Sequence, residues 1–100
     1  MKTITICGSM KFEKEMQRIA LELEIKHGYN VLQCIYNSME KELTALDMEL
    51  LSIAHYKKID ISDAIYVVDI DGYVGQSTRE EICYAEGNGK EIIMHSEYNL

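Results

Sequence analysis

Short apolar runs alternate along this chain with longer stretches in which apolar residues recur every three or four positions. The short runs are rich in β-branched and aromatic side chains, as expected of strands, and they occupy residues 3–7, 29–36, 64–68 and 91–94. The first longer stretch predicts a helix with an apolar stripe of Phe12, Met16, Ile19, Ala20 and Leu23. Gly28 follows its last turn, where glycine is the favoured residue.

Two further helices are predicted after the second and third apolar runs. The second helix begins after an N-cap at Asn37 or Ser38 and ends near Ile59. Its predicted buried stripe consists of Leu43, Leu46, Leu50, Ile53 and Ala54. The third helix runs from Thr78 to about Asn88, and Ser77 with Glu80 matches the capping-box pattern at its start.

This order of elements predicts the fold class. The strands are near-continuous apolar runs, which is typical of parallel strands covered by helices on both faces. We expect a small open α/β sheet with the strand order 2-1-3-4, Rossmann- or flavodoxin-like, with a fifth strand left open. Ligands bind such sheets where the order reverses, at the carboxyl ends of the strands. That rule selects residues 7–10 and residues 69–78 as the segments that face the site.

Length, charge and composition exclude several classes of function. The 100 residues fit one domain, 1–100, with one modest core. The formal net charge is −7, which argues against a nucleic acid polymer held by its phosphates. No apolar run reaches the roughly 18 residues that span a bilayer, and the first residues lack the apolar stretch of a signal peptide. We therefore expect a cytoplasmic protein with no membrane partner.

The three cysteines form no metal-binding or redox motif in the sequence. Cys7, Cys34 and Cys83 each lie within an apolar stretch, and no Cys-x-x-Cys pair occurs. We interpret them as small buried side chains of a protein in a reducing compartment. Nucleophilic cysteine chemistry is the alternative, and Cys7 is also close to the predicted site.

The turn after the first strand has the composition of an anion-binding turn. Gly8-Ser9-Met10 joins a strand to a helix, where small residues and free backbone N–H groups let a ligand approach closely. Neither a GxGxxG fingerprint nor a P-loop lysine motif is present. Classical dinucleotide or triphosphate binding is therefore not expected.

One acidic residue of the third helix has no obvious structural role. Glu80 is explained by the capping box, whereas Glu81 lies on the flank of the helix that we expect to face the sheet. A purely electrostatic role remains open, because acidic residues in the first turns complement the helix dipole.

Three segments in this order resemble a known family. They are Ile4-Thr5-Ile6-Cys7-Gly8-Ser9-Met10, then Ser62-Asp63-Ala64-Ile65, then Gly75-Gln76-Ser77-Thr78-Arg79-Glu80-Glu81-Ile82-Cys83-Tyr84-Ala85. Together they resemble the nucleoside 2-deoxyribosyltransferase superfamily, which includes the 2′-deoxynucleoside 5′-monophosphate N-glycosidases. The resemblance extends over nearly the whole chain.

The resemblance implies an activity and a catalytic residue. It implies an enzyme that cleaves or exchanges the N-glycosidic bond of a 2′-deoxynucleoside or its 5′-monophosphate, with Glu81 as the nucleophile that attacks C1′. The route would be retaining, through a covalent glycosyl-glutamate intermediate. The resemblance also implies that no cofactor and no metal is needed, and that a homodimer or higher homo-oligomer helps to close the site.

Two positions depart from the family pattern. His55 stands where relatives often have an aspartate near the base; it is either a proton donor to the leaving base or a plain helix-face residue between Leu51 and Ile59. Gly75 stands where transferases have an acidic residue near the sugar hydroxyl.

The same loop and the first turn supply the remaining predicted site residues. Hydroxyl and N–H groups at Ser77 and Ser9 favour a 5′-phosphate, although Ser77 is equally explained as a cap. Asp69 orients the sugar or assists proton transfer, or it is a solvated turn former. We thus expect Glu81, His55 and Asp69 as catalytic residues. The predicted substrate-binding residues are Cys7, Gly8, Ser9, Met10, Gly75 and Ser77.

Other interpretations of the same pattern remain open. The chain is alternatively a hydrolase of another nucleotide such as NAD, or a non-catalytic module that binds and senses a nucleotide. A third interpretation is an oligomerisation unit, because tyrosine is enriched at interfaces and several tyrosines look exposed. These are Tyr29, Tyr36, Tyr56, Tyr73 and Tyr98.

Overall fold

A computed structural model describes residues 1–98 and residue 100. The strands are β1 (Thr3–Gly8), β2 (Asn30–Leu32), β3 (Ala64–Val68) and β4 (Glu91–Met94). The helices are α1 (Glu13–His27), α2 (Ala45–Asp60) and α3 (Gln76–Gly87). Three short 3₁₀ turns complete the fold, and these are η1 (Met10–Phe12), η2 (Ile70–Gly72) and η3 (His95–Glu97). No helix among the described residues is long and apolar enough to cross a membrane.

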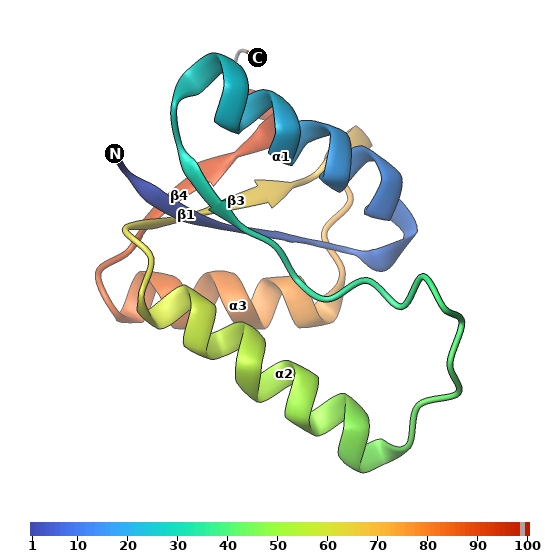
Figure 1. The fold of residues 1–100 in the computed structure, drawn as a ribbon. Coiled ribbons are helices and arrows are strands. Elements are labelled where there is room, and N and C mark those ends of the chain that lie inside the picture. The colour runs from blue at the N-terminus through green and yellow to red at the C-terminus, as the bar shows by residue number, and fades with distance from the viewer. Residues whose placement is uncertain (99) are drawn as a thin grey trace.

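The four strands form one all-parallel sheet in the order β2-β1-β3-β4, which confirms the predicted fold class and strand order. Figure 1 shows α1 on one face of this sheet and α2 with α3 on the other. The described residues form no fifth strand.

Side chains of β1 alternate between the two faces of the sheet, and so they divide the core in two. Ile4 and Ile6 pack with the buried side chains of α1, whereas Cys7 packs with Ile59 and Ala85 on the opposite face. A buried hydrogen bond of 2.6 Å between the hydroxyls of Thr5 and Ser62 satisfies the polar groups on that second face. The alternation therefore fixes which side chains of β1 reach α2 and α3.

The segment between β2 and α2 differs most from its prediction. The second strand was expected over residues 29–36, but only Asn30–Leu32 pairs with β1. The N-cap of α2 is Thr44 and not Asn37 or Ser38, because Thr44 and Asp47 form a reciprocal capping box. Residues 33–44 are therefore irregular backbone that joins the sheet to α2.

The predicted buried stripe of α2 is wrong. Leu46, Leu50 and Ile53 are 63%, 56% and 58% exposed, and the buried residues of the helix are His55 and Ile59. Every residue from Met48 to Ala54 is exposed. The C-terminal half of the helix lies against the body of the protein, whereas its N-terminal half extends away from it (Figure 1). The most apolar stripe of the helix is therefore exposed.

The start of α3 also differs from its prediction. The helix begins at Gln76, two residues before Thr78, with Gly75 as an N-cap that makes no side-chain hydrogen bond. Ser77 thus lies inside the first turn and does not form the predicted capping box with Glu80. The amide of Gln76 contacts Glu80 instead, at 3.3 Å.

Gly28 gives a test of how the first helix ends. Its φ of +70° and ψ of 23° are left-handed, and its N–H bonds the carbonyl of Leu23. We expect Gly28→Ala to lower the free energy of unfolding by about 1 kcal/mol, since a Cβ strains this conformation. Gly87→Ala, at the end of α3 with nothing within 4 Å of an added Cβ, should raise it by about 0.5–1 kcal/mol. Urea unfolding measures both; equal effects at the two positions would contradict the assignment.

Candidate active site

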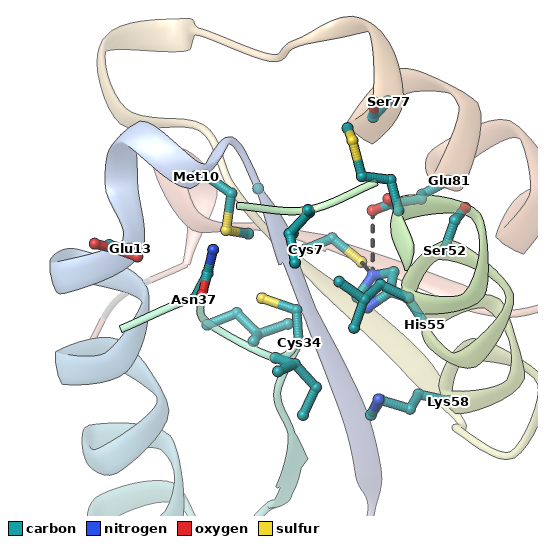
Figure 2. Close-up of a pocket in the computed structure, with 16 residues that line it drawn as sticks. Cys7, Met10, Glu13, Cys34, Asn37, Ser52, His55, Lys58, Ser77 and Glu81 are labelled. Atoms are coloured by element: carbon teal, nitrogen blue, oxygen red, sulfur yellow. Dashed lines mark hydrogen bonds and ion pairs between the residues drawn. The ribbon is translucent and has the colours of Figure 1, made fainter. Parts of the chain in front are cut away.

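A cavity of about 390 Å³ lies on the α2–α3 face of the sheet, at the carboxyl end of β1. Its walls come from the end of β1, the irregular segment after β2, one face of α2 and the first turns of α3 (Figure 2). The volume falls within the range of about 300–1,000 Å³ typical of small-ligand pockets. The cavity therefore lies next to the predicted switch point of the sheet, and it is large enough for a nucleoside or nucleotide.

The end of β1 forms the floor of this cavity. Cys7 is 1% exposed and faces the cavity because it follows Ile6, which points to the α1 side. Gly8 follows it, and a Cβ at Gly8 would meet Val68 and Met16 at 3.2–3.3 Å. A glycine at position 8 thus lets β1 and β3 pack closely beside the cavity.

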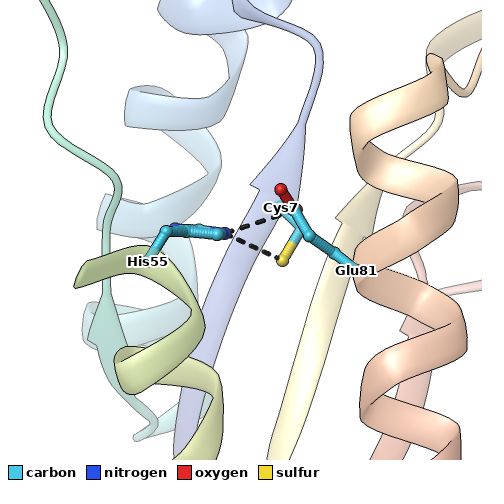
Figure 3. Close-up of side chains that lie close together, drawn as sticks. All are labelled: Cys7, His55 and Glu81. Carbon is cyan, nitrogen blue, oxygen red and sulfur yellow. Dashed lines mark hydrogen bonds and ion pairs between the residues drawn. The ribbon is translucent and has the colours of Figure 1, made fainter. Parts of the chain in front are cut away.

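The two helices on this face bring an imidazole and a carboxylate together above Cys7. His55 comes from α2 and Glu81 from α3, and the distance from His55 Nε2 to Glu81 Oε1 is 3.3 Å. The same Nε2 lies 3.5 Å from the sulfur of Cys7 (Figure 3). The side chains of His55 and Glu81 are only 11% and 15% exposed, so three residues distant in sequence form one largely buried cluster.

The environment of Cys7 keeps its thiol protonated. Burial raises the pKa of Cys7 well above its ordinary value, and the negative charge of Glu81 together with a hydrogen bond to it raises this pKa further. A cysteine nucleophile must ionise to a thiolate, which this environment disfavours. The alternative of nucleophilic catalysis by Cys7 is therefore unsupported by the electrostatics of the site.

The first turn of α3 presents uncapped backbone N–H groups near the cavity. Gly75 caps the helix without a side chain, and Ser77, which lines the cavity, lies one residue after the helix begins. The N-terminus of a helix attracts anions through its free N–H groups and its dipole. This end of the cavity can therefore accept a phosphate or another anion.

Some predicted site residues do not line the cavity. Ser9 accepts a hydrogen bond from the backbone N–H of Lys11 at the start of η1, and a Cβ added at Gly75 would meet the hydroxyl of Tyr73 at 3.6 Å. The carboxylate of Asp69, 6% exposed, accepts hydrogen bonds from the backbone N–H and the hydroxyl of Ser96 at 2.8 and 2.6 Å. Asp69 thus anchors the segment after β4, and its predicted catalytic role has no support in the structure.

Other cavity residues were not among the predictions. They lie on the irregular segment after β2, on the cavity-lining face of α2 or at the start of α1. These residues are Cys34 and Asn37, then Met48, Ser52 and Lys58, then Glu13. Met48, Ser52 and His55 follow helical spacing, so the face that contains His55 was recognisable in the sequence. The positions from the irregular segment carry no comparable periodic signal.

The cluster of Cys7, His55 and Glu81 also has the donor atoms of a metal site. The sulfur, the imidazole nitrogen and the carboxylate oxygen all lie within 4.8 Å of one another. Each of these groups is a common ligand of Zn²⁺.

Comparison of the chain with protein-family models, with curated proteins and with solved structures finds no match to any of them.

The burial of Cys7 predicts a large difference in reactivity among the three free thiols. Cys83 is exposed, Cys34 is partly buried and Cys7 is buried. At neutral pH we expect a disulfide reagent to modify Cys83 rapidly and Cys7 only as fast as the protein opens, because Cys7 is inaccessible and protonated. Absorbance of the released thiol and peptide mass spectrometry measure the rates. Cys83→Ser should remove the fast phase, whereas rapid labelling of Cys7 would overturn this description of the site.

Proposed function

We propose that this protein cleaves or exchanges the N-glycosidic bond of a 2′-deoxynucleoside or its 5′-monophosphate, with Glu81 as the nucleophile. The observation that carries the proposal is the position of this carboxylate. It is largely buried, it lines a cavity of nucleotide size, and it contacts a histidine from a different helix. A carboxylate withdrawn from water beside a ligand cavity is suited to attack an electron-poor sugar carbon.

The reaction would proceed in two displacements at C1′. In the first, an oxygen of Glu81 bonds to C1′ while the C1′–N bond breaks, and the base leaves with the electron pair and takes a proton from solvent. In the second, water or another base attacks C1′ and the ester bond to Glu81 breaks, which restores the carboxylate. The incoming water, or the N–H of the incoming base, releases one proton to solvent, which balances the proton that the first base takes up. The two inversions together retain the configuration at C1′.

His55 would act first by positioning the nucleophile. Its Nε2 contacts one oxygen of Glu81, which leaves the other carboxylate oxygen free to attack. A donor on one oxygen also offsets part of the cost of burying the carboxylate. In this arrangement Nε2 is committed to Glu81 and Cys7, which favours positioning over direct protonation of the base.

The polar groups of the cavity support a phosphorylated substrate. Ser77 lies at the anion-attracting start of α3, and Lys58 on α2 adds a cationic side chain to the cavity wall. Glu13 and Glu81 line the same cavity, and their negative charge opposes a phosphate close to them. We therefore propose that a 5′-phosphate would lie toward Ser77 or Lys58.

Two features beyond the cavity are consistent with this proposal. The three segments that resemble the nucleoside 2-deoxyribosyltransferase superfamily include most of β1, the start of β3 and most of α3. Five of their residues line the cavity, and these are Cys7, Gly8, Met10, Ser77 and Glu81. All three cysteines are free thiols, which supports action in the reducing cytoplasm.

One experiment separates this activity from its alternatives. The protein is incubated with deoxynucleosides, their 5′-monophosphates and NAD, each with and without an added free base, and the products are separated by chromatography. Release of free base, or its exchange for the added base, is the expected result. Cleavage of NAD alone would indicate a different nucleotide hydrolase, and tight binding without release would indicate a sensing module.

The nucleophile assignment predicts a sharp difference between two adjacent glutamates. Glu81→Gln should reduce base release by at least about 1,000-fold, because the amide keeps the shape of the side chain but cannot form the ester intermediate. Glu80→Gln, on the exposed side of the same helix, should retain nearly full turnover. Turnover is measured by chromatography and folding by circular dichroism. Retained base release in folded Glu81→Gln would exclude Glu81 as nucleophile.

We further propose that the protein acts as a homodimer formed through α2. Leu46, Leu50 and Ile53 are spaced by four and three residues, so they form one exposed apolar stripe along the helix. Of the five tyrosines that looked exposed in the sequence, only Tyr73 is exposed, at 45%. The apolar stripe of α2 is therefore the better candidate for self-association.

The charges beside this stripe favour an antiparallel pair of α2 helices. Asp47 and Glu49 lie near the start of the helix and Lys57 near its end. A twofold axis across the stripe would bring the acidic start of one helix beside the basic end of the other. The same axis would pack the two apolar stripes against each other and remove them from water.

The dimer predicts an effect of charge at the centre of the stripe. Leu50→Glu should convert the dimer to a monomer, since it would place a carboxylate in an apolar interface. Ile25→Glu, at an exposed apolar position on α1, is the matched control and should leave the dimer intact. Sedimentation equilibrium measures the mass of each variant. A wild-type protein that stays monomeric at high micromolar concentration would contradict the proposal.

A further inference from the structure

The three polar atoms above β1 have the spacing of ligands around a tetrahedral metal ion. Zn²⁺ forms bonds of about 2.0–2.1 Å to nitrogen or oxygen and of about 2.3 Å to sulfur. At tetrahedral angles, these bonds place a nitrogen ligand about 3.5 Å from a sulfur ligand and about 3.3 Å from an oxygen ligand. His55 Nε2 lies 3.5 Å from the sulfur of Cys7 and 3.3 Å from Glu81 Oε1. Two of the three distances between the ligand atoms thus match a tetrahedral zinc site, and all three atoms lie within 4.8 Å of one another.

We propose that Cys7, His55 and Glu81 form a binding site for Zn²⁺. A thiolate, an imidazole and a carboxylate together suit zinc, whereas magnesium and calcium prefer sites made of oxygen atoms. Because all three residues line the cavity, a fourth coordination position on the cavity side would be open to water. On binding, Cys7 releases its thiol proton to solvent and its sulfur takes the metal in place of that proton.

The surroundings of His55 indicate an exchangeable metal and not a permanent structural one. Its Nδ1 is buried and has no hydrogen-bond partner among residues 1–98. Ligating histidines usually donate from the second ring nitrogen to a carboxylate or carbonyl, and loss of that partner lowers affinity by about 10–100-fold. We therefore expect weaker binding than in a zinc finger, with the ion removed by a chelator while the fold persists.

Zinc in this site would inhibit base release. This consequence rests on the proposed function, because the metal would occupy the same carboxylate that attacks C1′. A bound ion would withdraw electron density from Glu81 and place its water in the cavity. Zinc and the substrate would then exclude each other.

The test of the site uses Co²⁺ as a spectroscopic substitute for zinc and needs no substrate. Titration of the wild-type protein with Co²⁺ should produce a near-ultraviolet thiolate charge-transfer band and intense visible bands typical of tetrahedral cobalt. Addition of Zn²⁺ should remove both. If no charge-transfer band appears, or only the weak visible bands of hexahydrated cobalt, the proposed site is wrong.

Variants identify the ligands. Cys7→Ser should abolish the charge-transfer band, and His55→Gln should weaken Co²⁺ binding by more than about 100-fold, since loss of a ligand costs more than loss of its hydrogen-bond partner. Cys83→Ser is the matched control, because its thiol is exposed and outside the cluster, and it should bind as the wild type does. If Cys7→Ser fails to fold, His55→Gln and Glu81→Gln still decide the matter. Unchanged binding in these variants would assign the metal elsewhere.

The enzymatic consequence is measured separately. Zn²⁺ should inhibit base release by the wild type and by Cys83→Ser with equal potency, and a chelator should restore it. Cobalt spectra without inhibition would retain the site and contradict only its link to catalysis. A protein that binds cobalt as predicted but releases no base would retain the site and contradict the proposed function.

Discussion

The contact between His55 and Glu81 is the constraint on which the candidate site depends. Withdrawal of a carboxylate from water is costly unless a donor reaches it, and here the donor is carried by another helix. The contact therefore couples the position of α2 to that of α3 above the end of β1. The contact engages Oε1 of Glu81, and the same side chain lines the cavity.

The elements that the sequence predicted well are those that pack into the core of this chain. The strands Ala64–Val68 and Glu91–Met94 have the predicted bounds, and the first helix ends at Gly28 as expected. In β3, in β4 and on the inner face of α1, the apolar positions of the sequence are the positions that pack in the core. The strand order followed from the alternation of strands and helices.

The predictions failed where a pattern has more than one physical explanation. An apolar stripe predicts that a helix buries one face, yet the stripe of α2 is exposed. The pair Ser77 and Glu80 matches a capping box, yet Gly75 starts the helix earlier. Glu81 and His55 were identified separately, the first from its lack of a structural role and the family resemblance, the second because it stands where relatives often have an aspartate. Their contact depends on how α2 crosses α3, which no local pattern encodes.

The buried thiol of Cys7 links the two proposals made for this cluster. While the sulfur holds its proton, which burial and Glu81 both favour, it is a neutral neighbour, and the carboxylate would be able to act on a sugar as proposed. If a metal ion replaced the proton, the same sulfur and the same carboxylate would become ligands, and the proposed nucleophile would be lost. A serine or alanine at position 7 would allow only the first state. The cysteine on the floor of the cavity would therefore decide whether this site takes a substrate alone or also a metal ion.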